Sequence, residues 1–176
     1  MSDEQTPEPV AEEPVRPLPE NPVLKGLVAA FENAEWSVSH GQDVVRLPRY
    51  ELRKFGEAAR EAGFEALADV TAVDWLDRRD DRFDVVVNLL SMQHVLRLRV
   101  LVGAPGDDPS VPSLVPVWPG ANFAEREVFD LFGIEFSDHP DLTRILMPDD
   151  WEGYPLRKDF EVGGVPVQFK AAHKVT

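Results

Sequence analysis

The chain has 176 residues, of which 43% are hydrophobic and 28% are charged, a composition that fits one soluble domain with an appended tail. Its 32 acidic and 18 basic residues give a formal net charge of -14, which argues against nucleic acid or an anionic membrane surface as the main partner. Cysteine is absent, which excludes disulfides, thiolate nucleophiles and thiolate ligands for zinc or iron–sulfur clusters.

The first segment, residues 1–21, is rich in proline and acidic side chains and has little to bury. We predict that it is a disordered acidic tail. It lacks a basic start followed by an apolar stretch, so we expect no signal peptide. The apolar runs farther along the chain are all shorter than the roughly 20 residues that a membrane-spanning helix needs.

A helix and a hairpin are expected next. Asn21 and Pro22 suit the cap and the first position of a helix. Two short segments with strand character, 35–40 and 43–48, follow that helix and flank Gly41. A glycine between two strand-like segments is typical of a β-hairpin, so we predict that they pair.

A second helix and three further strands complete the regular part of the chain. Pro48 opens the helix, apolar residues recur in it at helical spacing, and Gly63 ends it. The three segments with strand character are 64–75, 82–90 and 94–102. There is no regular strand–helix–strand alternation, so we predict an α+β fold with an antiparallel or mixed sheet covered by two helices. We assign residues 22–136 to this domain.

The last helix of the domain, predicted over 122–133, mixes carboxylates with aromatic residues on the same stripes. Arg126 lies one turn before Asp130, and we predict an i,i+4 ion pair between them. Glu125, Glu127 and Asp130 could instead be acid/base groups, because burial among phenylalanines would separate their pKa values. We favour the structural interpretation, in which Arg144 or Arg157 reaches the remaining carboxylates across an interface.

The four histidines stand singly, and none has the spacing that sets two ligands on one helix face, so we expect no metal site. His139 precedes Pro140, and we predict that its imidazole fixes a turn by donating to a backbone carbonyl.

Residues 137–176 form a C-terminal arm that is too rich in proline and glycine for a compact element. It places Trp151, Tyr154, Leu156 and Phe160 beside Arg157. Aromatic and arginine anchors on an extended segment are typical of a buried protein interface. We therefore expect the arm to dock on another protein of an assembly, while docking on its own domain stays an alternative.

Residues 121–160 closely resemble the signature of the C-subunit, also called the 30 kDa subunit, of respiratory complex I (NDH-1), the NADH:quinone oxidoreductase. The preceding domain also resembles that protein in length and in the order of its segments. The positions that carry the resemblance are Glu125, Arg126, Glu127, Asp130, Gly133, His139, Pro140, Asp141, Leu142, Arg144, Trp151, Gly153, Pro155, Leu156, Arg157, Lys158 and Asp159.

The resemblance implies an accessory subunit of the hydrophilic arm of the complex, without cofactor or catalytic residues of its own. It would pack on the large D-subunit, which with the B-subunit forms the quinone chamber. NAD(H), FMN, the iron–sulfur clusters and quinone would be bound by other subunits, on the cytoplasmic side of the cell membrane. Glu125 or Glu127 would pair with an arginine of this chain or of the D-subunit. Thr143 stands where the family usually has a basic residue, so one interface charge is missing.

Two other interpretations stay open. A related membrane-bound hydrogenase or a ferredoxin- or formate-linked complex contains a similar subunit. A free-standing acid/base enzyme that uses Glu125, Glu127 and Asp130 belongs to a different class, and it would be active alone.

Overall fold

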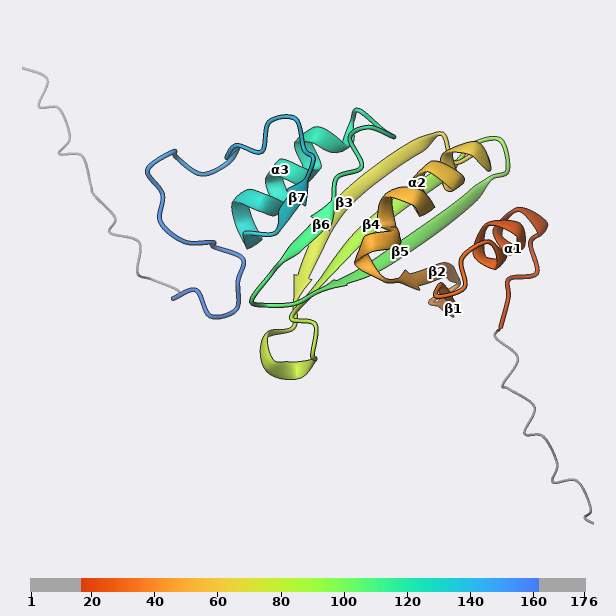
Figure 1. Cartoon of the computed structure of the whole chain (residues 1–176), viewed down its shortest axis with the longest axis horizontal. Helices are drawn as coiled ribbons and strands as arrows, with labels where there is room; N and C mark the ends of the chain where they lie inside the picture. The colour runs from red at the N-terminus through yellow and green to blue at the C-terminus, as the bar shows by residue number, and fades with distance from the viewer. Residues whose placement is uncertain (1–16, 162–176) are drawn as a thin grey trace, which may run out of the picture.

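The computed structural model describes residues 17–161 (Figure 1). Most of the predicted acidic tail and the last part of the arm lie outside the described residues. Helix α1 spans Pro22–Ala29 and begins as predicted. The Asn21 side chain accepts hydrogen bonds from the backbone N–H groups of Val23 and Leu24, at 3.0 and 3.3 Å. These bonds satisfy two of the amides that the first turn of any helix leaves free.

The predicted hairpin is also present. Strands β1 (Glu35–Ser39) and β2 (Gln42–Leu47) are antiparallel, and the two-residue turn between them is His40-Gly41. Both turn residues have positive φ angles, 51° and 75°. This is the turn geometry that matches the twist of paired strands, and glycine adopts it without strain.

The second predicted helix begins with a short 3₁₀ turn, η1 (Arg49–Glu51), directly after Pro48. It continues as α2, Leu52–Glu61. Gly63 follows with a φ angle of 94°, a conformation that favours glycine and ends the helix as expected.

The main sheet has five strands in the order β1-β2-β5-β4-β3 (Figure 1). Strands β3, β4 and β5 form an antiparallel meander, with a short 3₁₀ segment, Leu76–Arg78, between β3 and β4. Strand β2 pairs with β5 in parallel, so the sheet is mixed. The bounds of the three central strands are Ala66–Asp74 for β3, Phe83–Ser91 for β4 and Leu96–Ala104 for β5.

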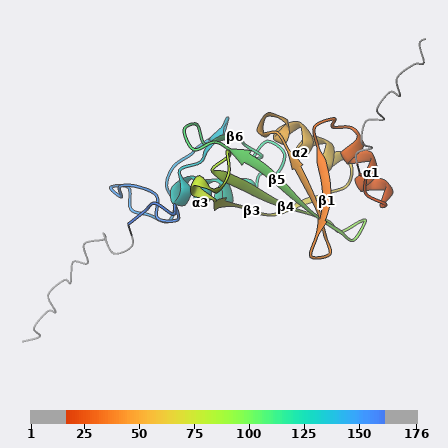
Figure 2. The same cartoon turned by 90° about the horizontal axis from the view of Figure 1, so that it is seen from below.

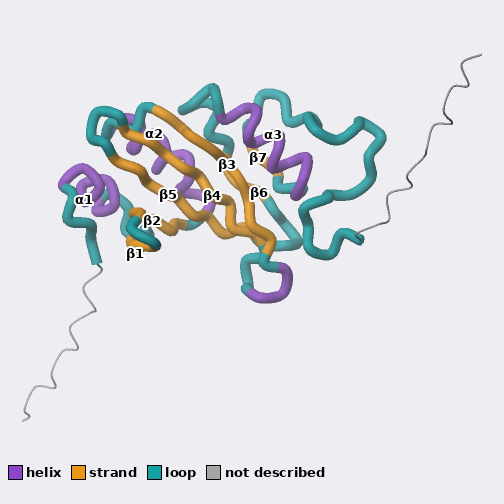
Figure 3. The backbone as a smooth tube through the Cα atoms, turned by 180° about the vertical axis from the view of Figure 1, so that it is seen from behind, coloured by secondary structure: helices purple, strands orange, loops and turns teal. Residues whose placement is uncertain are grey.

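One face of the sheet carries the core. Along β4, Val85, Val87 and Leu89 are buried, whereas Val86 and Asn88 between them are only half-buried. Helix α2 lies over one face of the strands in Figure 1, and the strands lie in front of it when the molecule is seen from behind (Figure 3). This is the pattern of an antiparallel meander with one packed face and one more accessible face.

The last regular elements are β6 (Ser110–Pro112), α3 (Ala121–Phe132) and β7 (Glu135–Ser137). Strands β6 and β7 pair in parallel as a separate two-stranded sheet, and α3 packs along β3, the edge strand of the main sheet (Figure 1). Helix α3 matches the predicted helix to within one residue. The arm beyond β7 lies at the opposite end of the molecule from α1 (Figures 1 and 2).

Candidate interface of helix α3 and the C-terminal arm

The carboxylates of α3 divide between the inside and the outside of the molecule. Glu125 and Asp130 are fully buried, whereas Glu127 is exposed. Phe123, on the same helix, is 64% exposed. The helix therefore turns two carboxyl side chains inward and leaves an aromatic ring at the surface, which reverses the usual arrangement of a surface helix.

Asp130 fastens the arm to α3. Its Oδ1 lies 2.7 Å from Nη1 of Arg144. Its Oδ2 accepts hydrogen bonds from three consecutive backbone amides of the arm, those of Ile145, Leu146 and Met147, at 2.7 to 3.0 Å. Burial by itself raises the pKa of this carboxyl, but the three amides and Arg144 outweigh it and lower the pKa to about 2. Asp130 is thus a carboxylate at any physiological pH.

The predicted ion pair between Arg126 and Asp130 is wrong. Arg126 instead donates to the carbonyl and the hydroxyl of Thr143, both at 3.0 Å, and to the carbonyl of Arg144 at 3.1 Å. Asp130 pairs with Arg144, which lies far from it in sequence, because the arm runs past this side of the helix. At Thr143, where the resemblance leads one to expect a basic side chain, a hydroxyl accepts a hydrogen bond from Arg126.

Glu125 has neutral partners. The hydroxyl of Ser113 donates to Oε2 at 2.7 Å, and the backbone N–H of Leu114 donates to Oε1 at 2.6 Å. His139 Nε2 is 4.0 Å from Oε2. Burial raises the pKa of Glu125 to about 7, against the opposing effects of the two hydrogen bonds and of the charge of Arg53. Within the described part of the chain no arginine forms an ion pair with Glu125.

His139 fixes the turn with which the arm begins, as predicted. Its Nδ1 accepts from the backbone N–H of Asp141 at 3.0 Å, which assigns the ring proton to Nε2. Nε2 lies 3.3 Å from the carbonyl oxygen of Asn122 on α3 and donates to it. The neighbouring Pro140 is exposed, and Leu142 packs against the hydrophobic core.

Arg157 caps the C-terminal end of α3. Its Nε donates to the carbonyl of Phe132 at 2.5 Å, and its Nη2 donates to the carbonyl of Gly133 at 3.3 Å. Carbonyls at a helix C-terminus have no partner within the helix, so a guanidinium there is favourable. The guanidinium also lies 4.5 Å from the ring centroid of Tyr154 and 5.4 Å from that of Phe83. Burial lowers the pKa of Arg157, as does the charge of Arg82.

The end of the described arm is fastened to the sheet. Asp74, at the end of β3, accepts from Arg82 at 2.9 Å and from the backbone N–H of Lys158 at 2.8 Å. Arg82 also pairs with Asp159 of the arm at 2.7 Å. The side chain of Asp74 is 1% exposed; burial raises its pKa, but Arg82 and the backbone amides lower it to about 2. Sequence patterns did not single out Asp74, Arg82 or Ser113.

Two glycines of the signature allow close packing, Gly133 between α3 and the arm and Gly153 within the arm. Gly133 has a φ angle of 69°, and a Cβ there would lie 2.5 Å from the ring of Tyr154. Gly153 has a φ angle of 87°, and a Cβ there would lie 3.0 Å from Phe160. Phe160 stacks on Trp151 with ring centroids 6.4 Å apart. Both positions therefore need glycine for backbone conformation as well as for space.

The predicted signature residues lie on α3, at its C-terminal end and on the arm that packs against it. The three carboxylates of α3, however, do not line a common cavity. Glu125 and Asp130 are each enclosed by their own partners, and Glu127 faces outward. What the surface offers instead is apolar. The large hydrophobic residues exposed on α3 and the arm are Phe123, Ile145, Leu146 and Leu156. Such an arrangement is suited to binding a protein.

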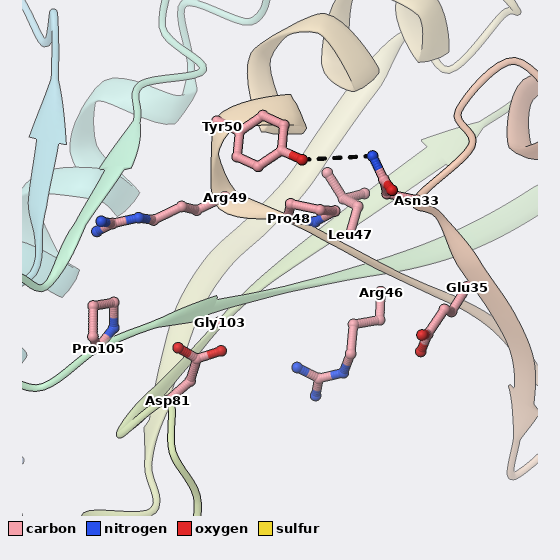
Figure 4. A pocket seen from close by; sticks show the side chains of 10 residues that line it. All are labelled: Asn33, Glu35, Arg46, Leu47, Pro48, Arg49, Tyr50, Asp81, Gly103 and Pro105. Atoms are coloured by element: carbon pink, nitrogen blue, oxygen red, sulfur yellow. Dashed lines mark hydrogen bonds between the residues drawn. The ribbon is translucent and has the colours of Figure 1, made fainter.

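A separate groove of about 410 Å³ lies between η1 and the β2–β5 region, and Tyr50, Arg46 and Asp81 are among its lining residues (Figure 4). Its two arginines already have carboxylate partners: Arg46 pairs with Asp84 and Arg49 with Asp108. Over residues 17–161, no group of three or more His, Asp or Glu side chains is placed to hold a metal ion. In the same range no helix has the length and apolar character to cross a membrane.

Comparison with known protein families gives a match over most of the chain. Residues 45–166 match the family described as "Respiratory-chain NADH dehydrogenase, 30 Kd subunit". Among curated proteins, the C-subunit of NADH-quinone oxidoreductase from Nocardioides sp. is 42% identical over 158 residues, covering 84% of this chain and 63% of that protein. The protein of the same name from Acidothermus cellulolyticus is 43% identical over 138 residues, covering 77% of this chain and 72% of the relative.

The chain is shorter than several relatives that it resembles. It spans 63% of the Nocardioides protein and 44% of the Saccharopolyspora erythraea protein of the same name, which is 50% identical over 109 residues and covers 62% of this chain.

Two solved structures resemble the fold. The trypsin-resistant fragment (1–134) of Nqo5 is 36% identical, with a TM-score of 0.61, and covers 68% of this chain and 96% of its own. A chain of the membrane-bound sulfane sulfur reductase, an archaeal respiratory membrane complex, is 24% identical with a TM-score of 0.71, covering 88% and 96%, and at that identity it supports the α+β fold alone. With a family match over residues 45–166 and relatives above 40% identity, this chain belongs to the family of the 30 Kd subunit of the respiratory-chain NADH dehydrogenase.

Proposed function

We propose that this chain is the C-subunit of an NADH:quinone oxidoreductase and that its part in the reaction is structural. The complex as a whole is the enzyme, and it transfers electrons from NADH to quinone. Family membership and the names of the relatives support this proposal. A further support is that the buried signature carboxylates hold the arm in place or bond to neutral donors, and do not line a common cavity.

The observation that carries the proposal is the combination of a fixed arm and an exposed apolar surface. The arm is held at Asp130, at the C-terminal end of α3 and at Asp74. With its shape fixed in this way, it exposes Leu146, and α3 exposes Phe123. A surface that is ordered before binding loses less conformational entropy when a partner docks, which favours tight assembly.

The partner that we propose for this surface is the D-subunit of the complex, with the B-subunit adjacent to it in the assembled quinone-reducing module. NAD(H), FMN, the iron–sulfur clusters and quinone would be bound by those and other subunits, and this chain would bind no cofactor. We further propose that the chain lies at the cytoplasmic side of the membrane, where it would contact the bilayer only through the complex.

Purification through a tag on this chain, in a mild detergent, tests the assembly. We expect the D- and B-subunits and the NADH-oxidising module to co-purify, together with NADH:quinone activity. Recovery of a hydrogenase or sulfur-reducing catalytic subunit in place of the NADH-oxidising module would assign the chain to a related machine. Recovery of the chain alone, as a stable monomer, would contradict the assembly proposal.

Paired surface variants test the docking face. Phe123→Ser and Leu146→Ser each replace an exposed apolar side chain, at 64% and 55% exposure, and both should leave the fold intact. We expect them to lower the yield of assembled complex. Met92→Ser is the matched control, because Met92 is 74% exposed on the turn between β4 and β5, away from the arm. Equal assembly of all three variants would exclude this face as the docking surface.

A further inference from the structure

The turn between β7 and the rest of the arm covers Glu125. In this turn, residues 138–141, the side chain of His139 is 0% exposed and lies 4.0 Å from the Glu125 carboxyl, which is itself 0% exposed. Asp138 has a φ angle of 61°, in the left-handed region that non-glycine residues rarely adopt. The turn is thus a covering segment that leaves β7 through a sharply bent residue.

Few bonds hold the turn down. His139 Nε2 donates to the carbonyl of Asn122, and the backbone N–H of His139 donates to the carbonyl of Phe136 at 3.1 Å. Arg53 pairs with the exposed carboxylate of Asp138 at 3.2 Å, and the backbone N–H of Thr143 donates to the carbonyl of Asp141 at 3.1 Å. Ser137, just before the turn, belongs to β7 and is fixed by bonds to Ser113, Val111 and Arg53. A segment held by a few, partly exposed hydrogen bonds opens at a lower free energy than the strands beneath it.

The surroundings of Glu125 contain little that would stabilise a negative charge. Ser113 and Leu114, which precede α3, contribute neutral donors, and the turn contributes His139. From α2, Arg53 acts at longer range, since its guanidinium is bonded to the carbonyls of Ser113 and Ser137 and to Asp138. A buried carboxylate without a close cation favours either protonation or contact with water.

We propose that residues 138–141 are a proton-linked lid, which closes over the protonated carboxyl of Glu125 and opens when that carboxyl ionises. Such a lid would govern how the arm is attached to its own domain, and it is independent of the proposed function. In the closed state the Ser113 hydroxyl can accept the proton of the acid, since a hydroxyl rotates to donate or to accept. Opening admits water to the carboxylate.

The pKa of Glu125 sets the pH range of the lid. Burial raises this pKa from 4.5 to about 7. Because the closed state binds the proton more tightly than the open state, closure is most favoured at low pH and is lost as the pH rises through about 7. The lid would therefore respond across the neutral range, where small changes in pH alter the fraction of open molecules.

Hydrogen exchange of the full chain, followed by mass spectrometry between pH 6 and pH 9, tests the lid. Protection factors are compared, because they remove the ordinary base catalysis of exchange. We expect protection of the His139 and Asp141 amides to fall by up to about tenfold for each pH unit above the midpoint, since opening is then linked to release of one proton. Unchanged protection across this range in the wild-type chain would overturn the lid.

Two variants identify the titrating group. Glu125→Gln cannot ionise and should make the protection of the turn independent of pH. Ser113→Ala removes a donor that lowers the pKa of Glu125, so it should move the midpoint to higher pH. The matched control is Glu127→Gln, two residues away on the exposed side of α3, which should leave the profile unchanged. An unshifted midpoint in Ser113→Ala, or a wild-type profile in Glu125→Gln, would assign the effect to another group and overturn the role of Glu125.

Discussion

Asp130 and Arg144 form a 2.7 Å ion pair between the C-terminal half of α3 and the arm, and the second oxygen of Asp130 accepts three successive arm amides. The side chain of Asp130 is fully buried, and that of Arg144 is 18% exposed. Asp130 therefore organises a stretch of chain that has no helix or strand of its own.

Asp130→Asn keeps the shape of the side chain but removes its charge and one of its two acceptor oxygens. We expect a loss of about 1–3 kcal/mol in the free energy of unfolding, because Arg144 and part of the amide cluster are left without partners. Urea unfolding followed by tryptophan fluorescence measures this loss. Glu127→Gln, on the same helix but exposed, should change stability by less than about 0.5 kcal/mol. Equal effects of the two variants would mean that Asp130 does not anchor the arm.

Substitution of Arg82 should lower the free energy of unfolding much more than substitution of Asp159, although the two residues form one ion pair. Arg82→Gln leaves the buried carboxylate of Asp74 without its cation, so we expect a loss of about 3–5 kcal/mol in the free energy of unfolding. Asp159 is 51% exposed, so Asp159→Asn should cost less than about 1 kcal/mol. Limited trypsin digestion gives a second readout, since release of the arm exposes the bonds after Arg157 and Lys158. Comparable losses in both variants would contradict the buried role of Asp74.

Gly133→Ala tests the close contact between α3 and the arm. Its φ angle of 69° alone costs an alanine about 1 kcal/mol, and the new Cβ would lie 2.5 Å from the Tyr154 ring. We expect both a lower melting temperature and faster cleavage of the arm. Gly120→Ala, at the other end of the same helix, places a Cβ with no atom within 4 Å and should be nearly neutral. A Gly133→Ala protein as stable as Gly120→Ala would exclude tight packing at this point.

The pH dependence of global stability should have two opposing limbs. Asp74 and Asp130 have pKa values lowered from 3.8 to about 2. The stability that their ionised forms give to the folded state is therefore present above pH 3.8 and is lost as the pH falls through about 2. Glu125 has a raised pKa, so the stability that its protonated form gives to the folded state is present below pH 4.5 and is lost as the pH rises through about 7. For Glu125 the loss is at most about 3 kcal/mol. Urea unfolding from pH 2 to pH 9 should show maximal stability in mildly acidic solution, and Glu125→Gln should flatten the neutral limb.

Local signals gave the best predictions. The cap at Asn21, the hairpin turn at Gly41 and the glycine that ends α2, Gly63, each depend on residues that are neighbours in the chain, and all three are present. The parallel pairing of β2 with β5 was not predicted, because alternation within a strand indicates which face it buries but not which strand it joins.

The charges of the candidate site were harder to assign for the same reason. Arg126 is one turn from Asp130, so spacing predicted a pair, but the arm brings Arg144 to Asp130 instead. Nothing in the sequence near Glu125 indicates that Ser113 will donate to it. An aspartate at the end of a strand, such as Asp74, could have suggested a buried anchor, but its partner Lys158 is 84 residues away.

The three amides held by Asp130 also bear on solubility. Ile145 and Leu146 are exposed, and apolar residues of this kind in an extended segment commonly promote aggregation, because a free row of N–H and C=O groups recruits a further strand. Here the N–H groups of Ile145, Leu146 and Met147 all point to one carboxylate. The arm can therefore present apolar side chains to a partner without offering a backbone edge along which a second copy could add.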